Sequence, residues 1–262
     1  MPNILEKIVA TKQHEILQAK QLESLASLQE KITHLPRPLK FKQSLINKAN
    51  NRHPAVIAEI KQASPSKGLL TQHFDHLQLA LDYQQAGATC LSVLTDEQYF
   101  QGKAEFIAQV KQIVDLPVLR KDFMIDEYHI YQSRVLGADA ILLIVAILDD
   151  CQLQDYYQLA LELDLSVLVE VHDRQELERA LPLSQGIIGI NNRNLKTFET
   201  DINTSLHLLE YIPDSKVVVT ESGIHKKEQV LTMLQNNIYG FLVGESLVKS
   251  RDTQAAYKEL FG

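Results

Sequence analysis

The sequence lacks the features that would indicate a metal centre, a disulfide framework or a membrane segment. It has only two cysteines, Cys90 and Cys151, which form no CxxC pair, and no His/Cys cluster has zinc-ligand spacing. We therefore expect reduced, buried thiols, no metal and no other cofactor. No stretch is apolar over the length that a signal sequence or membrane-spanning helix needs, so we expect a cytoplasmic protein without a membrane partner.

The sequence also lacks an excess of positive charge. Its 26 Lys and Arg residues are outnumbered by 33 Asp and Glu residues, which gives a formal net charge of −7 at pH 7. Proteins that bind nucleic acid usually carry a basic face, so nucleic acid is not an expected partner. A 262-residue chain with 45% hydrophobic and 23% charged residues can bury a large core, and this length is typical of a single α/β domain.

Short apolar segments, each followed by an amphipathic stretch, recur along the chain at intervals of about 20 to 35 residues. Most are continuous runs of Val, Ile and Leu, which is typical of parallel strands covered on both faces. Eight such βα units predict an α/β fold, a single (β/α)8 TIM barrel, with a doubly wound open sheet as the alternative. The expected strands are Ala55–Ile60, Thr89–Leu94, Pro117–Leu119, Asp139–Val145, Ser166–Val171, Gly186–Ile190, Lys216–Thr220 and Gly240–Val243.

Helices are expected between these strands. Asp149 and Asp173 stand where helix N-caps are useful, and Gly87 and Gly137 stand where helices often end in a left-handed residue. The expected helices are Phe74–Gln85, Lys103–Ile113, Glu127–Leu136, Asp149–Leu163, Asp173–Leu181, Asn203–Tyr211 and Lys226–Leu234. Residues 1–54 look helical but too polar for an independent core, so we expect an N-terminal helical extension that caps a barrel of residues 55–262.

Five of the apolar segments run directly into an ionisable or amide side chain. Buried strands tolerate charge poorly unless it is paired or used, and the carboxyl ends of barrel strands meet at one mouth. Any one such residue could simply end a strand at the solvent edge, but five together predict one polar site. These residues are Lys61, Lys121, Glu170, Asn191 and Glu221. Glu59 shares a strand face with Lys61, because side chains two apart point the same way.

Three loops indicate a phosphate site beside these residues. The loop after the first strand reads ASPSKG and includes Ser64, which by itself could be an ordinary surface turn. The seventh and eighth strands end in glycine-containing loops, and phosphate sites in barrels are often built from these two loops. A small phosphorylated substrate is therefore expected. The other candidate phosphate residues are Arg193, Ser222, Gly223, Gly244 and Glu245.

Several long segments, in order along the chain, closely resemble the indole-3-glycerol phosphate synthase family of tryptophan biosynthesis. They are EIKQASPSKG, LSVLTDEQYFQG, VLRKDFMIDEYHIYQSRVLGADAILLI, LVEVHDRQELERAL, GINNRNLKTFETD, VTESGI and FLVGESLV. The resemblance covers all eight βα units and extends to the N-terminal helices. It implies ring closure of 1-(2-carboxyphenylamino)-1-deoxyribulose 5-phosphate to indole-3-glycerol phosphate, with loss of CO2 and water. Contacts with other tryptophan-pathway enzymes are left open.

The residue types suit this reaction. Attack of an aromatic carbon on a ketone requires protonation of the ketone oxygen, and Lys121 is the candidate acid. The later loss of water requires a second acid and a base, and the family pattern assigns these roles to Glu170 and Lys61 without fixing the order. We expect burial and a neighbouring lysine to lower the proton affinity of the acid, and we expect arginine to replace Lys121 poorly.

The resemblance implies supporting roles for the remaining candidates. Glu59 is expected to orient Lys61 or Lys121, or simply to offset buried charge. Asn191 and Glu221 are expected to bond to hydroxyls or to the carboxylate of the substrate. Phe123 and Leu142 are expected either to line the aromatic ring or to serve the core alone.

Two other functions compete with this interpretation. The first is an aminosugar-phosphate isomerase on the same fold. Enzymes of that kind resemble a barrel with a cysteine acid or base at the end of the first strand, and this chain has Glu59 and Lys61 there, which argues against that function. A non-catalytic barrel that binds phosphorylated metabolites is the second alternative, and a broken Lys121/Glu170 pair would favour it. Fold alone does not decide between them, because barrels host many unrelated activities.

Overall fold

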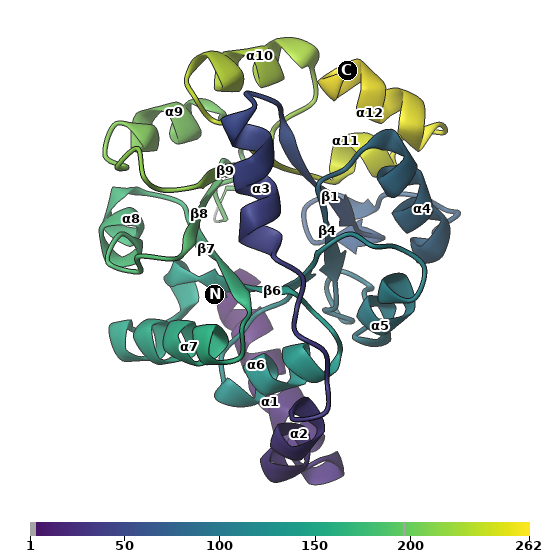
Figure 1. Cartoon of the computed structure of the whole chain (residues 1–262), viewed down its shortest axis with the longest axis vertical. Coiled ribbons are helices and arrows are strands. Elements are labelled where there is room, and N and C mark those ends of the chain that lie inside the picture. Colours follow the sequence, from purple (N-terminus) through teal and green to yellow (C-terminus); the bar gives the residue numbers. More distant parts are fainter. Residues whose placement is uncertain (1–3, 196) are drawn as a thin grey trace.

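The computed structural model describes residues 4–195 and 197–262, and within these ranges eight parallel strands close into a barrel surrounded by helices (Figure 1). The order around the barrel is β1-β10-β9-β8-β7-β6-β5-β4, and β1 pairs with both β4 and β10. This closure excludes an open sheet. The strands are β1 Ala55–Ile60, β4 Cys90–Leu94, β5 Val118–Lys121, β6 Ala140–Ile144, β7 Ser166–Val171, β8 Ile187–Asn191, β9 Val218–Glu221 and β10 Gly240–Val243.

Helices connect and extend these strands. A small antiparallel pair, β2 (Ala63–Ser64) with β3 (Gly68–Leu69), lies in the loop after β1, and a 3-10 turn, η1 (Val145–Ile147), follows β6. The helices are α1 Ile4–Leu22, α2 Leu25–Ile32, α3 Phe41–Asn50, α4 His76–Ala86, α5 Glu105–Lys111, α6 Glu127–Val135, α7 Asp150–Glu162, α8 Arg174–Ala180, α9 Asn203–Leu209, α10 Lys227–Gln235, α11 Glu245–Val248 and α12 Thr253–Phe261.

The local signals in the sequence correspond to the observed element ends. Asp149 and Asp173 accept hydrogen bonds from backbone N–H groups in the first turns of α7 and α8, as N-caps do. Gly87 and Gly137 follow α4 and α6 at positive φ, as predicted. The strands begin one or two residues later than predicted in several cases, and Lys121, Asn191 and Glu221 are the last residues of β5, β8 and β9.

The barrel strands are buried on both faces, which explains their continuous apolar sequences. Val56 and Val93 on one face pack outward against α4, α5, α10 and α12. Alternate residues such as Ile57 and Leu119 point inward and form a separate core cluster inside the barrel. The strand ends above this inner cluster are where polar side chains can gather without disturbing the packing.

The N-terminal helices pack against both ends of the barrel. Phe41 and Leu45 of α3 join the inner core cluster near the start of the strands, and in Figure 1 α3 crosses the near end of the barrel. Ile8 of α1 joins the same cluster from the opposite, carboxyl end, where α1 lies behind the strands in this view. The residues of the expected extension numbered 1–3 lie outside the described part of the chain.

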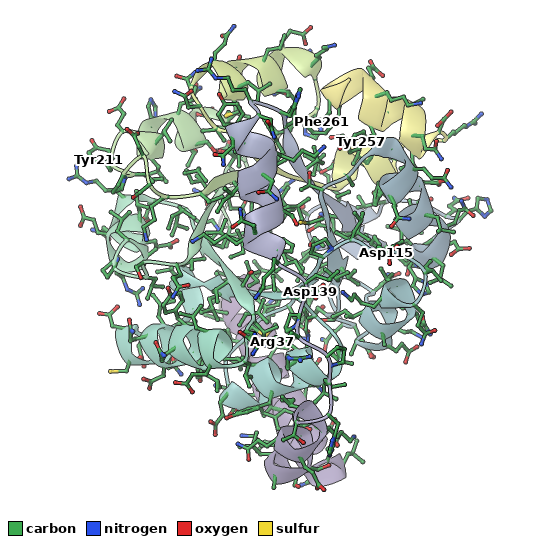
Figure 2. All side chains as sticks on the ribbon, in the orientation of Figure 1. Arg37, Asp115, Asp139, Tyr211, Tyr257 and Phe261 are labelled. Atoms are coloured by element: carbon green, nitrogen blue, oxygen red, sulfur yellow. The ribbon has the colours of Figure 1, made fainter. Side chains whose placement is uncertain are left out.

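Asp139 connects the extension to the barrel (Figure 2). Its buried carboxylate accepts hydrogen bonds from the backbone N–H of Leu39 at 2.6 Å and of Val118 at 2.8 Å. The ammonium group of Lys111 contacts the same carboxylate at 2.7 Å. One side chain therefore fixes the segment before α3, the start of β5 and the end of α5 relative to each other.

Lys12 of α1 connects the extension to the opposite end of the barrel. Its Nζ lies 2.9 Å from Asp96 Oδ2, just after β4, and 3.0 Å from Asp122 Oδ1, which directly follows Lys121. All three side chains are at most 3% exposed. The two carboxylates explain why the pKa of Lys12 is raised even though burial lowers it.

We predict that Lys12→Met destabilises the protein by about 3–5 kcal/mol, because removing one partner of a buried ion pair leaves the other charge uncompensated. Urea unfolding followed by circular dichroism measures this loss. The control is Lys20→Met, which removes an exposed pair with Asp126 and is expected to cost less than about 1 kcal/mol. Equal stability of the two variants would contradict the prediction.

The cysteine prediction was right for one residue only. Cys90 is buried in β4, but Cys151 is exposed in the first turn of α7, and both are free thiols. The prediction for Cys151 was wrong because the chain meets solvent on that side of α7. None of the described helices combines the length and apolar character needed to span a membrane.

Candidate active site

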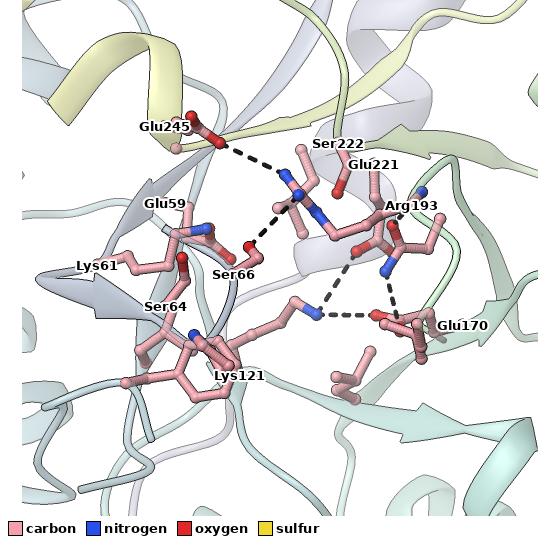
Figure 3. A pocket seen from close by; sticks show the side chains of 18 of the residues that line it. Glu59, Lys61, Ser64, Ser66, Lys121, Glu170, Arg193, Glu221, Ser222 and Glu245 are labelled. Carbon is pink, nitrogen blue, oxygen red and sulfur yellow. Dashed lines mark hydrogen bonds and ion pairs between the residues drawn. The ribbon is translucent and has the colours of Figure 1, made fainter. Parts of the chain in front are cut away.

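A pocket opens at the carboxyl ends of the barrel strands (Figure 3), and residues of α1 form part of its lining. Strands β1, β5, β6, β7, β8, β9 and β10, or the loops directly after them, each contribute residues to its wall. The structure brings together all fourteen residues that the sequence predicted: Glu59, Lys61, Ser64, Lys121, Phe123, Leu142, Glu170, Asn191, Arg193, Glu221, Ser222, Gly223, Gly244 and Glu245.

Glu59 and Lys61 form an ion pair at the end of β1. Glu59 is 3% exposed and Lys61 continues from the same strand face, so both point into the pocket as the i, i+2 spacing predicted. The sequence left open whether Glu59 orients Lys61 or Lys121, and in the structure Glu59 contacts Lys61. Its charge also acts on Lys121 through space.

Lys121 projects from the end of β5 into a group of carboxylates. Its Nζ lies 2.8 Å from Glu170 Oε2 and 3.5 Å from Glu221 Oε2. The other oxygen of Glu170, Oε1, accepts a hydrogen bond from Asn191 Nδ2 at 3.2 Å. Figure 3 shows these contacts converging from β5, β7, β8 and β9. The arrangement holds a proton donor and a proton acceptor within hydrogen-bond distance of each other.

The expectation that Lys121 has a lowered proton affinity was wrong for the substrate-free protein. Burial lowers the pKa of Lys121, but the carboxylates of Glu170, Glu221 and Glu59 outweigh burial and raise it above its ordinary value. Lys61, the neighbouring lysine that was expected to lower it, is paired with Glu59. Lys121 is therefore protonated at neutral pH.

The two carboxyl groups beside Lys121 have opposite properties. Burial raises the pKa of Glu170, but Lys121 and His172 outweigh this effect and hold the pKa well below its usual range. Burial raises the pKa of Glu221 to about 8, since Glu221 has no cation as close as those of Glu170. Environments that separate two pKa values in this way assign different proton roles. Near neutral pH Glu170 is ionised, whereas Glu221 takes up a proton more readily.

Arg193 lies across the other side of the pocket. Its guanidinium is 3.4 Å from Glu245 Oε2 at the start of α11 and 3.4 Å from Ser66 Oγ in the loop after β1. Arg193, on the loop after β8, thus connects two of the loops that were expected to bind phosphate, those after β1 and β10 (Figure 3). Planar guanidinium groups suit bidentate binding of phosphate oxygens.

The turn after β9 has an unusual backbone. Ser222 and Gly223 both adopt positive φ, at 65° and 83°. A positive φ is uncommon for serine and is often retained at functional sites. A β-carbon at Gly223 would lie 2.7 Å from Thr200 Cγ2, so the turn also requires the missing side chain.

Gly244 allows the end of β10 to approach Glu59 closely. A β-carbon there would lie 2.6 Å from Glu59 Oε2. We predict that Gly244→Ala lowers kcat/KM about 10²-fold, because displacement of catalytic groups by about 1 Å can have an effect of this size. Steady-state kinetics measure it. Gly186→Ala, at the distant start of β8, is the control, and a Gly244→Ala enzyme as active as the control would contradict the prediction.

Sequence reasoning missed several residues of the site. Ile4, Leu5 and Ile8 of α1 line the pocket, as does Phe100 after β4. The ring of Phe100 packs 6.0 Å from that of Phe123 in a tilted arrangement, which extends the apolar wall. His172 was also missed, although it stands two residues after Glu170. Nothing in the sequence shows which face of α1 meets the pocket.

The site offers acid–base groups rather than metal ligands. Within residues 4–195 and 197–262 no group of three or more His, Cys, Asp or Glu residues is arranged to hold a metal ion. The described side chains instead combine an ammonium group, an ionised carboxylate and an apolar wall. Such a pocket can transfer protons to and from a substrate that is polar at one side and apolar at the other.

Fold and pocket together define a (β/α)8 barrel with a lysine–glutamate acid–base site at the carboxyl ends of its strands. Solved structures with this fold include a protein of the Pyrococcus furiosus tryptophan synthase complex, with a TM-score of 0.60, 14% identity and coverage of 79% of this chain and 97% of that chain. KGPDC from Streptococcus mutans matches with a TM-score of 0.58 and 12% identity, over 79% of this chain and 95% of that one. These similarities show the fold.

Residues 5–260 match the family model described as indole-3-glycerol phosphate synthase. The protein of that name from Acinetobacter baylyi is 50% identical over 99% of this chain and 96% of its own length. That from Polaromonas sp. is 48% identical over 100% of this chain and 99% of its own. The chain belongs to the indole-3-glycerol phosphate synthase family.

Proposed function

We propose that the protein closes the ring of 1-(2-carboxyphenylamino)-1-deoxyribulose 5-phosphate to give indole-3-glycerol phosphate, CO2 and water, as a decarboxylase of tryptophan biosynthesis. The observation that carries the proposal is the Lys121–Glu170 pair, 2.8 Å apart and buried among other polar groups at the mouth of the barrel. Membership of the family supports the same reaction.

The reaction begins when the ring carbon that bears the substrate carboxylate attacks the ketone carbon. Lys121 donates a proton to the ketone oxygen as the carbon–carbon bond forms. The bond to the carboxylate then breaks, and its electron pair restores the aromatic ring as CO2 leaves. The position of Lys121 suits this step. The neighbouring carboxylates keep Lys121 protonated, and burial limits the access of water to the transferred proton.

Loss of water completes the reaction. The new hydroxyl group leaves as water with a proton supplied by an acid. Lys61, which lines the same pocket, is this acid in the proposal. Glu170 removes the proton from the adjacent carbon, since its low pKa keeps it ionised. Two protons are donated and one is recovered, so each turnover takes up one proton from solvent, which balances the loss of the substrate carboxylate as neutral CO2.

The remaining residues bind the substrate in this proposal. The phosphate lies among Ser64, Arg193, Ser222, Gly223, Gly244 and Glu245, with Glu245 contributing its backbone N–H because its carboxylate already pairs with Arg193 and Lys249. Phe123 and Leu142 contact the aromatic ring, and Asn191 and Glu221 bond to polar groups of the chain between ring and phosphate. No cofactor is needed for these steps.

Residues 1–54 form an extension of one barrel domain in this proposal, because Ile8, Phe41 and Leu45 share a core cluster with barrel residues. We also propose a cytoplasmic location, since a multiply charged sugar phosphate does not cross membranes freely.

Incubation of the purified protein with the carboxyphenylamino-deoxyribulose phosphate tests the function. Indole fluorescence should grow at the rate of CO2 release. If the protein binds inorganic phosphate but forms no indole, the proposal is wrong and the alternative of a non-catalytic, phosphate-binding barrel replaces it.

A further inference from the structure

His172 occupies a position that the proposed mechanism leaves unexplained. It follows β7 directly, at the start of the short loop before α8, and its side chain is 12% exposed. Its Nε2 lies 3.3 Å from Glu170 Oε1, and its Nδ1 lies 2.9 Å from Glu176 Oε2. The histidine therefore bridges the proposed base to a second carboxylate on α8.

Glu176 is bound to His172 twice. Besides contacting Nδ1, its Oε2 accepts a hydrogen bond of 2.8 Å from the backbone N–H of His172. Asp173, the N-cap of α8, fixes the same turn by accepting a hydrogen bond from the backbone N–H of Glu176. The loop geometry thus sets the direction of the imidazole ring, and the Nε2 side of the ring faces Glu170.

The two oxygens of Glu170 have separate partners. Lys121 contacts Oε2, whereas His172 and Asn191 contact Oε1. In the described part of the chain, His172 Nε2 makes no hydrogen bond, and its ion-pair contact is Glu170 Oε1 at 3.3 Å. This nitrogen is therefore directed at the carboxylate of Glu170.

We propose that His172 is a positioning residue for the reaction: anchored by Glu176, its ring holds the Glu170 oxygen that Lys121 does not contact. This inference rests on the proposed function, because it assigns the carboxylate of Glu170 the role of base. With a carboxylate at each nitrogen, the ring carries both protons and is a cation. It then fixes the direction of the base and adds a second positive charge beside it.

The charge balance supports this role. Burial lowers the pKa of His172, but its bonds to Glu170 and Glu176 outweigh burial and raise it to about 10. The groups facing the Glu170–His172 pair are Lys121 from β5, Glu221 from β9 and Glu176 from α8. Lys121 and His172 are the cations among them, so loss of His172 removes one of the two charges that keep Glu170 ionised.

His172 also lines a second pocket, next to the active-site pocket, and Asn191 and Arg193 line both. Glu176 lines the second pocket too, to which neither Glu170 nor Lys121 contributes, and Glu170 lines the active-site pocket. A small residue at position 172 would leave a gap beside Glu170, because the imidazole side chain is only 12% exposed. The test variant is therefore His172→Phe, which keeps a ring in this place and removes both N–H groups.

We expect His172→Phe to lower kcat about tenfold at pH 7 with KM changed less than about threefold, because a base that is loosely held reacts less often in the productive geometry. The pKa of Glu170 rises when the cation is lost, so the acidic limb of the kcat–pH profile should move upward by about one pH unit or more. A merely structural role would lower thermal stability without moving this limb.

Three further variants sharpen the test. His172→Gln keeps an N–H for Glu170 without the charge, so it should regain part of kcat while the acidic limb stays shifted. Glu176→Gln should shift the limb in the same direction by less, and it remains informative if His172→Phe does not fold. His207→Phe, on the exposed side of α9, is the control and should match the wild type. A wild-type kcat and acidic limb in His172→Phe would overturn the proposal.

NMR of the imidazole nitrogens separates this inference from the proposed function, because it needs no substrate. Both nitrogens of His172 should stay protonated from pH 6 to about pH 9 in the wild type. Loss of a proton below about pH 8 would overturn the proposal. Absence of indole formation in the wild type together with a protonated His172 would reject the function and retain the contact.

Discussion

Lys121→Met is expected to lower kcat by roughly 10²- to 10⁴-fold, the usual contribution of a positioned general acid. Methionine keeps most of the length of the side chain but carries no proton, so the ketone oxygen is left without a donor. The effect should fall on kcat more than on KM, because Lys121 contacts the group that changes in the reaction. Steady-state kinetics with indole fluorescence as the readout measure both constants.

Lys121→Arg should recover little of this activity. Arginine keeps the charge, but its planar group does not fit between Glu170 and Glu221 as a compact ammonium does. The control is Lys48→Met on the exposed side of α3, which should leave kcat unchanged. Activity of Lys121→Arg within tenfold of the wild type would show that charge alone is needed at this position.

Glu170→Gln is expected to have the second large effect, a loss of roughly 10²- to 10⁴-fold in kcat. Glutamine has the same shape but does not accept a proton, so the final loss of water is blocked. The substitution also removes the carboxylate nearest to Lys121, and the pKa of Lys121 should fall, because the three neighbouring carboxylates are what raise it. As the pH is raised, any residual activity should therefore begin to decline at a lower pH than the wild-type activity does.

Binding separates this chemical role from a structural one. Calorimetry with inorganic phosphate should give a dissociation constant for Glu170→Gln within about threefold of the wild type, since the partners of Glu170 are Lys121, His172 and Asn191 rather than Arg193 or Glu245. Glu178→Gln on α8, which removes an exposed pair with Arg174, is the matched control. Equal kcat values in Glu170→Gln and Glu178→Gln would exclude Glu170 as the base.

Glu170 and Glu221 show why two glutamates in similar sequence contexts acquire different properties. Each is among the last two residues of its strand, and each is at most 3% exposed. Glu170 has Lys121 at 2.8 Å and His172 at 3.3 Å, whereas Glu221 has Lys121 at 3.5 Å. Differences of this size decide whether burial or a neighbouring charge dominates the pKa.

The barrel and its pocket could be predicted because the signals are local and repeated. Continuous Val, Ile and Leu segments mark strands covered on both faces, and parallel strands in a closed barrel bring all their carboxyl ends to one rim. Lys121, Asn191 and Glu221 therefore met in one place as predicted. The contribution of α1 could not be predicted in the same way, since helical periodicity does not show which surface a helix covers.

The sequence by itself determined the fold, the family and the polar side chains at the strand ends that line the pocket, because backbone pairing follows the apolar pattern and strand ends share a rim. Only the tertiary structure decided which charges meet. Glu59 pairs with Lys61, Lys121 with Glu170, and Lys12 with two carboxylates about 85 and 110 residues away along the chain. Proton affinity depends on burial and on separations of a few ångströms between such residues, and these distances exist only after folding.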